Sequence, residues 1–353
     1  FALIRNCRRH AFLLLTLFGA SPAVCSSFVE GRQHELLPVG HTGSLHMPHG
    51  TSLRMGRLGY QSEAQATLAV SYNGLEGYAA SLHDALTRPW PAYEAVGIRN
   101  PGGDYNQLAT TLLQIENEFY GTIRPKRVIF PGERPLHALR ERGVEYIEVR
   151  LLDLNPFEPI GIAASTLRFI DVFLLHCLLS DSPPDTPAEI RELGHNQHLT
   201  AARGREPGLQ LMRGGQPVAL VDWGTEIIDQ LMPLAERLDA LHGGHDHVLA
   251  VSQAREALHA PDTLPSAQAL YLPLATAAGC LGVVGLRPGT SGDFSLSQRN
   301  LLESFTRQIA LVLDRQRLCD AEQGARLLAE SERLGKTLLN SVSHELRTPL
   351  AAI

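Results

Sequence analysis

Two segments of the chain alternate between polar and apolar residues, and this alternation constrains the fold more than any other feature. In Val144–Leu152 the polar positions are Tyr146, Glu148 and Arg150, and aliphatic residues stand between them. A strand with one wet face and one buried face requires this pattern. The segment Leu112–Tyr120 has the same period of two. The sequence therefore predicts two strands, each with a polar face rich in charge.

The basic run Arg124–Arg127 lies between these segments and is predicted to form the turn that joins them. A simply solvated outer face would explain one such strand. Two in succession, joined by basic residues, favour a site for an anionic ligand and a metal ion, because carboxylates and cations are then gathered on one surface.

Composition limits the classes of protein that remain. A chain of 353 residues with 44% hydrophobic and 19% charged residues has room for two or three soluble globular domains. A net charge of -6 argues against nucleic acid as the main partner. The five cysteines are scattered without metal-binding spacing, which predicts free thiols in a reducing compartment and a cytoplasmic location. Because the chain starts at Phe1 and stops inside a helical run, we expect a piece of something longer.

Near the start, three arginines precede the apolar run AFLLLTLFGA, as in a secretory signal. The run is too short to span a membrane, and the cysteines do not suit export. We therefore predict an internal helix that ends near Gly19. The following loop carries His41, His46 and His49, which could bind a metal, although isolated loop histidines usually do not.

Periodicity predicts helices over Ser165–Ser180, Glu189–Thr200 and Ile227–Leu241. Residues 67–75 have the composition of a strand, and residues 201–217 that of a basic, glycine-rich loop. The segment that follows the last of these helices contains a cluster of side chains of the kinds that bind metal ions, but its two glycines favour a turn that ends a helix. The cluster consists of His242, His245, Asp246 and His247.

The segments LFGASPAVCSSF, TSLRMGRLGY, LLQIENEFYGTIRPKR and VEYIEVRLLDLNPFEPIGI resemble proteobacterial glutamate–cysteine ligases. The resemblance runs from about Phe1 to about Ala269 and covers the C-terminal half of that family. It implies an α+β fold, part of a curved antiparallel sheet like that of glutamine synthetase, with flanking helices. It also implies ATP-dependent condensation of glutamate with cysteine, the first step of glutathione biosynthesis, with ATP and Mg²⁺ as cofactors.

The resemblance also implies roles for particular residues. In TSLRMGRLGY a guanidinium and a phenol can together hold a carboxylate, and by the resemblance Arg54, Tyr60 and Tyr120 bind the cysteine substrate. Glu148 corresponds to a magnesium ligand, and Arg150 to a catalytic residue that stabilises phosphate charge during transfer. The family's N-terminal half, with its other metal ligands, is not in this sequence, so we expect this part alone to be inactive.

Beyond Ala269 the sequence changes character. Residues 271–288 predict a β-hairpin, and Ser295 with Gln298 has the spacing of a capping box at the start of a helix. This part resembles the end of a GAF domain, an incomplete α/β unit. A ligand pocket is not expected there, because only the last strands and a helix of such a domain are present.

The last helix contains the string SHELRTPL, which resembles the phosphoacceptor box of histidine kinases. The resemblance implies that His344 accepts a phosphoryl group, that Glu345 is its general base and that Thr348 assists dephosphorylation. The apolar residues of this helix fall within one arc, which would form the dimer seam of a four-helix bundle. They are Leu327, Leu334, Leu338, Val342 and Leu346.

The sequence thus predicts a ligase part at 1–269, a GAF part at 270–318 and a kinase dimerisation and phosphoacceptor helix at 319–353. Expected partners are glutamate and cysteine, a second copy through residues 319–353, and a response-regulator receiver domain. Two accounts of the combination stay open. One is a truncated fusion, natural or arising in assembly; the other is a signalling histidine kinase whose degenerate ligase-like domain senses an amino acid. We favour the first, because the junction falls inside both domains and only a short linker-like stretch lies there.

Overall fold

The computed structural model describes residues 1–39, 43–59, 63–66, 68–156, 158–260, 270–276, 279–286, 294–295, 297–319 and 322. The chain divides into two compact units, Phe1–Ala269 and Leu270–Ile353. Each unit is described by itself. Tyr60, His344, Glu345 and Thr348 lie outside the described residues, as do the apolar arc and the dimer seam predicted for the last helix.

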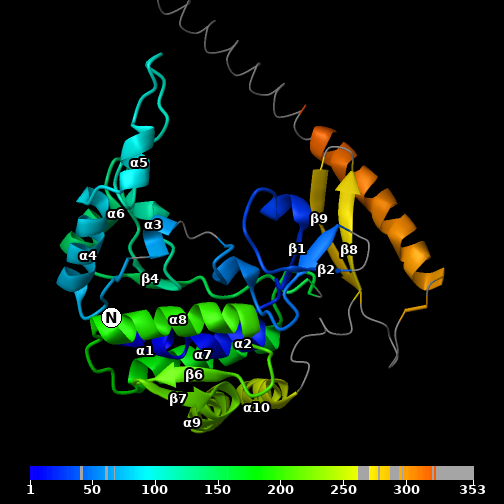
Figure 1. Cartoon of the computed structure of the whole chain (residues 1–353). Helices are drawn as coiled ribbons and strands as arrows, with labels where there is room; N and C mark the ends of the chain where they lie inside the picture. Colours follow the sequence, from blue (N-terminus) through cyan, green and yellow to red (C-terminus); the bar gives the residue numbers. More distant parts are fainter. Residues whose placement is uncertain are drawn as a thin grey trace, which may run out of the picture. The chain divides into compact units, whose positions relative to one another are not determined.

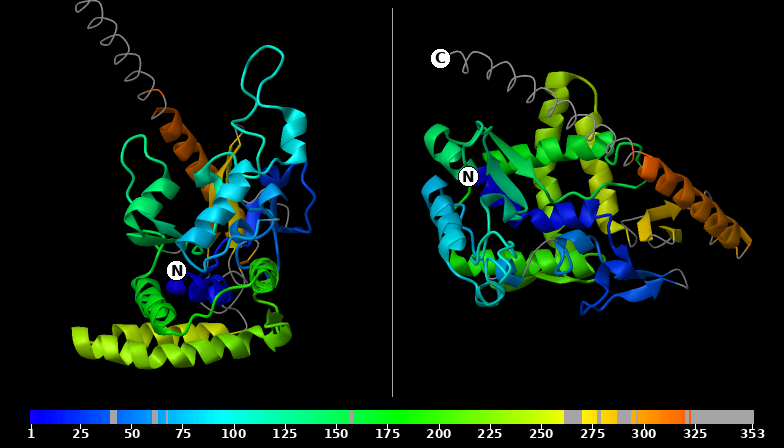
Figure 2. Two further views of the ribbon diagram at one scale, coloured as in Figure 1. Left: turned by 90° about the vertical axis from the view of Figure 1, so that its left-hand side faces the viewer. Right: turned by 90° about the horizontal axis from the view of Figure 1, so that it is seen from above.

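A group of packed helices forms the core of the first unit (Figure 1). Its members are α1 (Ala2–Arg9), α2 (Ala11–Phe18), α7 (Ala164–Leu179), α8 (Pro187–Arg203), α9 (Leu220–His242) and α10 (Asp246–His259). Figure 2 shows the blue α1–α2 segment between the green helices α7 and α8, and α1 contacts α7 while α2 contacts α8. Chain segments more than 150 residues apart in sequence thus share one hydrophobic core.

The helix predicted to end near Gly19 is confirmed as α2, whose C-cap is Gly19. It is apolar on all sides, and its residues from Ala11 to Leu17 are buried, as a helix without a polar face must be. Gly19 fits because a Cβ there would lie 2.5 Å from the Leu15 carbonyl oxygen and 2.8 Å from Cβ of Thr51. The apolar run is therefore the centre of the fold in this structure.

The three helices predicted from periodicity are confirmed as α7, α8 and α9. Helix α8 starts two residues before the predicted bound, where the Thr186 hydroxyl accepts a hydrogen bond from the Glu189 backbone at 3.2 Å. Helix α9 begins at Leu220, earlier than predicted, because Leu220 and Trp223 are also buried against the core.

Shorter elements surround this core. The other helices of the first unit are α3 (Glu63–Ala66), α4 (Leu75–Thr87), α5 (Pro91–Val96) and α6 (Pro135–Arg142), with 3-10 turns η1 (Ser26–Val29), η2 (Leu53–Met55) and η3 (Glu116–Glu118). Its strands are β1 (Ala23–Cys25), β2 (Leu37–Val39), β3 (Ser44–His46), β4 (Ile123–Lys126), β5 (Tyr146–Val149), β6 (Gln210–Arg213) and β7 (Gln216–Ala219). They form a sheet in the order β1-β3-β2 and the antiparallel pairs β4-β5 and β6-β7.

One of the two predicted polar strands is confirmed and the other is wrong. Val144–Leu152 contains β5, but Leu112–Tyr120 is an irregular segment around η3. The alternation fails there because Leu112 and Leu113, which are adjacent, are both buried. Their backbone N–H groups donate to the carbonyl oxygens of Arg88 and Ala85, so the end of α4 fixes the segment.

The predicted basic turn is also wrong. Residues 124–126 belong to strand β4, which pairs with β5 in the register Arg124 to Glu148 and Lys126 to Tyr146. The connection between the strands is longer and contains α6. The polar sheet face therefore exists, but β4 supplies it in place of the segment 112–120.

Two smaller predictions also need correction. Within residues 67–75, the described positions before α4 form no strand. The predicted basic loop at 201–217 contains the end of α8, all of β6 and part of β7. By contrast, the turn predicted at His242 is confirmed: α9 ends there, and Gly243 has a φ of 79°, which favours glycine.

The second unit begins with the predicted hairpin, which is confirmed as β8 (Leu270–Thr276) and β9 (Gly279–Leu286). The helix over residues 297–319 follows. The Ser295 N–H donates to the Gln298 side chain at 2.9 Å, and the Gln298 N–H donates to the Ser295 hydroxyl at 3.3 Å. These reciprocal bonds confirm the capping box.

The cysteines whose side chains are described form no disulfide bond, namely Cys7, Cys25, Cys177 and Cys319. Among the described residues no helix has the length and apolar character that crossing a membrane needs.

Candidate ligase site

The polar face of the β4–β5 pair gathers three cations around one carboxylate. Oε2 of Glu148 accepts hydrogen bonds from Arg124 Nε at 3.2 Å and Nη2 at 3.0 Å. The amine of Lys126 lies 3.7 Å and the guanidinium of Arg150 3.9 Å from the same oxygen. The cluster carries an excess of positive charge, which suits an anionic ligand.

Arg124 holds the Glu148 carboxylate from the buried side of the cluster. It is buried, with 6% of its surface exposed, and its Nη1 also donates to the Phe119 carbonyl oxygen at 2.9 Å. Burial raises the pKa of Glu148, but the hydrogen bond from Arg124 and the charges of Arg124, Lys126 and Arg150 outweigh it, so the pKa lies below its usual value. Glu148 is therefore an anion at neutral pH.

The predicted site residue Arg150 lies between Glu148 and Tyr120. Its guanidinium carbon is 4.8 Å from the centre of the Tyr120 ring, a cation–π distance. Its backbone N–H donates to the Thr122 carbonyl oxygen at 2.8 Å. The structure thus brings Tyr120, Glu148 and Arg150 together, although Tyr120 does not belong to a strand.

Arg54, predicted to bind the cysteine substrate, holds the chain that follows β5. Its Nε donates to Oδ1 of Asp153 at 2.8 Å, and its Nη2 donates to the carbonyl oxygens of Arg150 and Leu152 at 2.8 and 2.7 Å. The Asp153 carboxylate is nearly buried and also accepts bonds from Ala20 and Ser21. Arg54 therefore positions Arg150 through its backbone, and its substrate contact remains a prediction.

Sequence reasoning missed Arg124 and Asp153 as parts of the site. The sequence predicts a turn at Arg124, and only the β4–β5 register places this residue opposite Glu148. Asp153 follows the polar strand directly in the string LLDLNP. An acidic residue so close to a buried strand could have signalled a partner for an arginine.

A cavity of about 940 Å³ lies beside the cluster, and Tyr120 lines it. Arg54, Glu148 and Arg150 are not among its lining residues. Helix α8 contributes Arg191, His195 and His198, which the sequence did not single out. Burial first, then the charges of Arg57 and His195, lower the pKa of His198, so its imidazole is neutral at pH 7.

The residues described around Glu148 do not form a metal site by themselves. The hydrogen bonds to Glu148 within the described chain go to Oε2, so Oε1 could serve as one oxygen ligand. However, the described residues contain no group of three or more histidines, cysteines or carboxylates arranged to hold a metal ion. This also applies to His46, His49 and the His242 cluster, in which His247 is hydrogen-bonded to Asp239 at 2.7 Å, whereas His41 lies outside the described residues.

Two family models match parts of the chain. The family model of glutamate–cysteine ligases matches residues 1–200, and that of GAF domains matches residues 225–315. The GAF match starts inside α9, earlier than the predicted bound at residue 270.

Among curated relatives, the glutamate–cysteine ligase of a Janthinobacterium species is 50% identical over 269 residues, which are 76% of this chain and 51% of that protein. The Alcanivorax borkumensis ligase is 47% identical over 275 residues, 76% of this chain and 52% of that protein. The Pseudomonas paraeruginosa ligase is 44% identical over 332 residues, 94% of this chain and 60% of that protein. The chain therefore spans about half the length of the first two relatives.

A solved structure gives the same result for the fold. The crystal structure of glutamate–cysteine ligase from Francisella tularensis in complex with AMP matches with a TM-score of 0.69 and 33% identity. The match covers 75% of this chain and 53% of that one. This likeness, together with the mixed helices and strands, supports the α+β class predicted from the sequence. The ligase fold, the aligned relatives and the family match over residues 1–200 agree, and the chain belongs to the glutamate–cysteine ligase family.

Proposed function

We propose that Phe1–Ala269 contributes one wall of a glutamate–cysteine ligase site, which forms γ-glutamylcysteine from glutamate, cysteine and ATP. The observation that carries this proposal is the meeting of Tyr120, Glu148 and Arg150 on the β4–β5 face. A phosphorylated glutamate builds up negative charge during the reaction, and a fixed guanidinium is suited to stabilise it.

Within this proposal, Arg150 stabilises the phosphoryl group, and Tyr120, Tyr60 and Arg54 hold the cysteine substrate. Arg150 is suited to its role because its backbone is held by Thr122 and Arg54 while its guanidinium remains partly exposed. Glu148 Oε1 is offered as one ligand for Mg²⁺. The remaining metal ligands would come from the part of the ligase fold that this chain does not span.

The test is an assay for γ-glutamylcysteine with ATP, Mg²⁺, glutamate and cysteine. We expect no product from the chain alone, and product once the N-terminal half of a relative is co-expressed with it. In the restored pair, Arg150→Gln should lower kcat by at least about a hundredfold, whereas the exposed Arg237→Gln should leave it unchanged. Product from the chain alone would disprove the need for a second half. Full activity of the Arg150 variant would disprove its role.

A second candidate function is phosphoacceptance at His344, with Glu345 as general base and Thr348 assisting dephosphorylation. The string SHELRTPL and the GAF-family match over residues 225–315 support it. We expect acid-labile phosphate on His344 only when a kinase catalytic domain and ATP are supplied in trans. Equal labelling of wild type and His344→Gln, or no labelling of either, would reject this function.

A further inference from the structure

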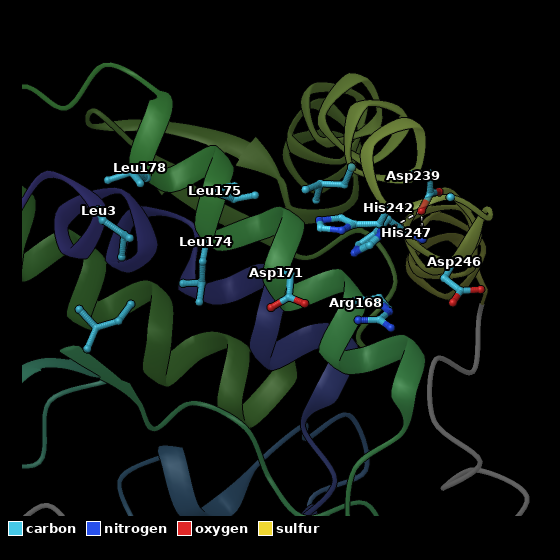
Figure 3. Close-up of a pocket in the computed structure, with 13 residues that line it drawn as sticks. Leu3, Arg168, Asp171, Leu174, Leu175, Leu178, Asp239, His242, Asp246 and His247 are labelled. Atoms are coloured by element: carbon cyan, nitrogen blue, oxygen red, sulfur yellow. Dashed lines mark hydrogen bonds and ion pairs between the residues drawn. The ribbon is translucent and has the colours of Figure 1, made fainter.

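A second hollow, with a volume of about 660 Å³, lies between α7, α9 and α10. Its volume is within the range of small-molecule sites. Figure 3 shows that one end is apolar, with Leu3, Leu175 and Leu178, and that the other end carries the charged and imidazole side chains. We call this hollow the α7–α9 cleft.

A buried acid–imidazole pair forms part of the polar end. Nδ1 of His247 lies 2.7 Å from Oδ1 of Asp239, and the carboxylate also accepts the backbone N–H groups of His247 and Val248 at 3.1 and 2.9 Å. The two side chains are only 9% and 5% exposed. Because Asp239 occupies Nδ1, Nε2 is on the opposite side of the ring, and it has no hydrogen-bond partner within the described chain.

The described residues hold only Nδ1 of this imidazole, and the other ring nitrogen is left for a ligand. His247 lines the cleft, so a ligand there can reach Nε2. With Nδ1 donating to the Asp239 carboxylate, Nε2 of a neutral imidazole can accept a hydrogen bond from an N–H group of a ligand.

Three further charges surround the same end: Arg168 and Asp171 on α7, and Asp246 at the start of α10. None of them has a hydrogen bond or ion pair with another side chain in the described parts of the chain. Both positively and negatively charged side chains are therefore available to a ligand. A lone carboxylate ligand would meet two acidic side chains, and a lone amine would meet the guanidinium.

The rest of the cleft is aliphatic. Its lining includes Leu3, Ile147, Leu174, Leu175, Leu178 and Leu238. Burying an apolar body against these side chains would supply the hydrophobic part of binding.

The cleft is separate from the proposed ligase site. Ile147 lines the cleft and Glu148 belongs to the charge cluster. Because they are consecutive residues of β5, their side chains point to opposite faces of the strand.

We propose that the α7–α9 cleft binds a zwitterion with an aliphatic body, namely an apolar α-amino acid or a short apolar peptide. Its carboxylate lies against Arg168. Its ammonium lies against Asp171 and Asp246. The aliphatic body fills the leucine-lined end, and a peptide fills more of the volume than a single amino acid does.

Calorimetric titration of the full chain tests this with matched probes. Leucyl-leucine carries both charges, its N-acetyl derivative only the carboxylate, and its amide only the ammonium. We expect leucyl-leucine to bind at least about tenfold more tightly than either derivative, since each loses one charge-assisted contact. Leucine is titrated as well, to distinguish a site for an amino acid from a site for a peptide. Whichever of leucine and leucyl-leucine binds more tightly identifies the class of ligand.

Substitutions then locate the site. Arg168→Gln and Asp171→Asn should each weaken leucyl-leucine at least about tenfold. The exposed Arg237→Gln on α9 and Asp181→Asn after α7 are charge-matched controls outside the cleft and should bind as wild type does. Both cleft residues are exposed, so the variants should keep the wild-type far-UV circular dichroism.

The outcomes decide the proposal. The proposal is supported if the zwitterion binds, both cleft variants weaken this binding and both control variants leave it unchanged. No binding of either zwitterion overturns it, as does equal binding of the acetylated or amidated peptide. Binding that the cleft variants leave unchanged places the ligand elsewhere and overturns it as well.

Discussion

At the scale of single residues, the Glu148 carboxylate is the centre of the candidate site. It is the partner of Arg124, which is buried and would otherwise keep a charge without a counter-ion. Removing such a partner costs more than removing an exposed ion pair, because the remaining charge stays desolvated.

We therefore predict that Glu148→Gln lowers the free energy of unfolding by about 1–2 kcal/mol. The matched control is Glu145→Gln. Glu145 is exposed and lies 3.6 Å from Arg127, so its loss should change stability by less than about 0.5 kcal/mol. Urea unfolding of the full chain measures both. An equal effect of the two substitutions would contradict the role given to Arg124.

His10 provides a pH-dependent prediction. Burial, and then the nearby charge of His176, lowers its pKa to about 3, so the folded chain keeps it neutral. In the unfolded chain His10 binds a proton near pH 6.5, so the contribution of neutral His10 to the free energy of unfolding is fully present above that pH. It should decrease as pH falls from 6.5 toward 3.

His10→Phe should flatten this decrease, because Phe cannot be protonated and fits a site beside Phe173. Melting temperatures from pH 7 to pH 4 test it. The exposed His83→Phe is the control and should keep the wild-type slope. A slope that is the same for wild type and His10→Phe would show that His10 does not contribute.

At the scale of elements, substitution by alanine should change stability in opposite directions at two glycines, one at the end of α2 and one inside α8. A Cβ at Gly19 would meet the Leu15 carbonyl oxygen and Thr51, whereas nothing lies within 4 Å of a Cβ at Gly194 inside α8. We predict that Gly19→Ala destabilises by about 1–3 kcal/mol through overpacking. Gly194→Ala should stabilise by about 0.5–1 kcal/mol, since alanine favours helix. Chemical unfolding of both variants gives the comparison, and destabilisation by both would refute it.

Periodicity identified the long helices because each must bury an apolar stripe whatever its partners are. It misjudged Leu112–Tyr120 because the backbone bonds of Leu112 and Leu113 to α4 are formed across the fold. The same limit applies to the basic run at 124–127, whose strand character depends on pairing with β5.

At the scale of the whole molecule, the first unit depends on α2. Leu14 is fully buried in a core that also includes residues of α7, α9 and α10. Leu14→Ala should lower the stability of this unit by about 2–5 kcal/mol. The exposed Leu179→Ala should change it by less than about 0.5 kcal/mol. A mild effect at Leu14 would argue that the N-terminal run is not part of the core.

The sequence by itself determined the ligase motifs, the main helices, the hairpin at 270–286 and the capping box, because these depend on local spacing and short-range bonds. Only the tertiary structure decided which residues meet. It paired Arg124 with Glu148, turned Arg54 toward Asp153 and the chain after β5, and enclosed the cleft around His247. The two ion pairs join residues that are 24 and 99 positions apart in sequence, and the cleft brings Arg168 and His247 together over 79 positions. No local pattern encodes such distances.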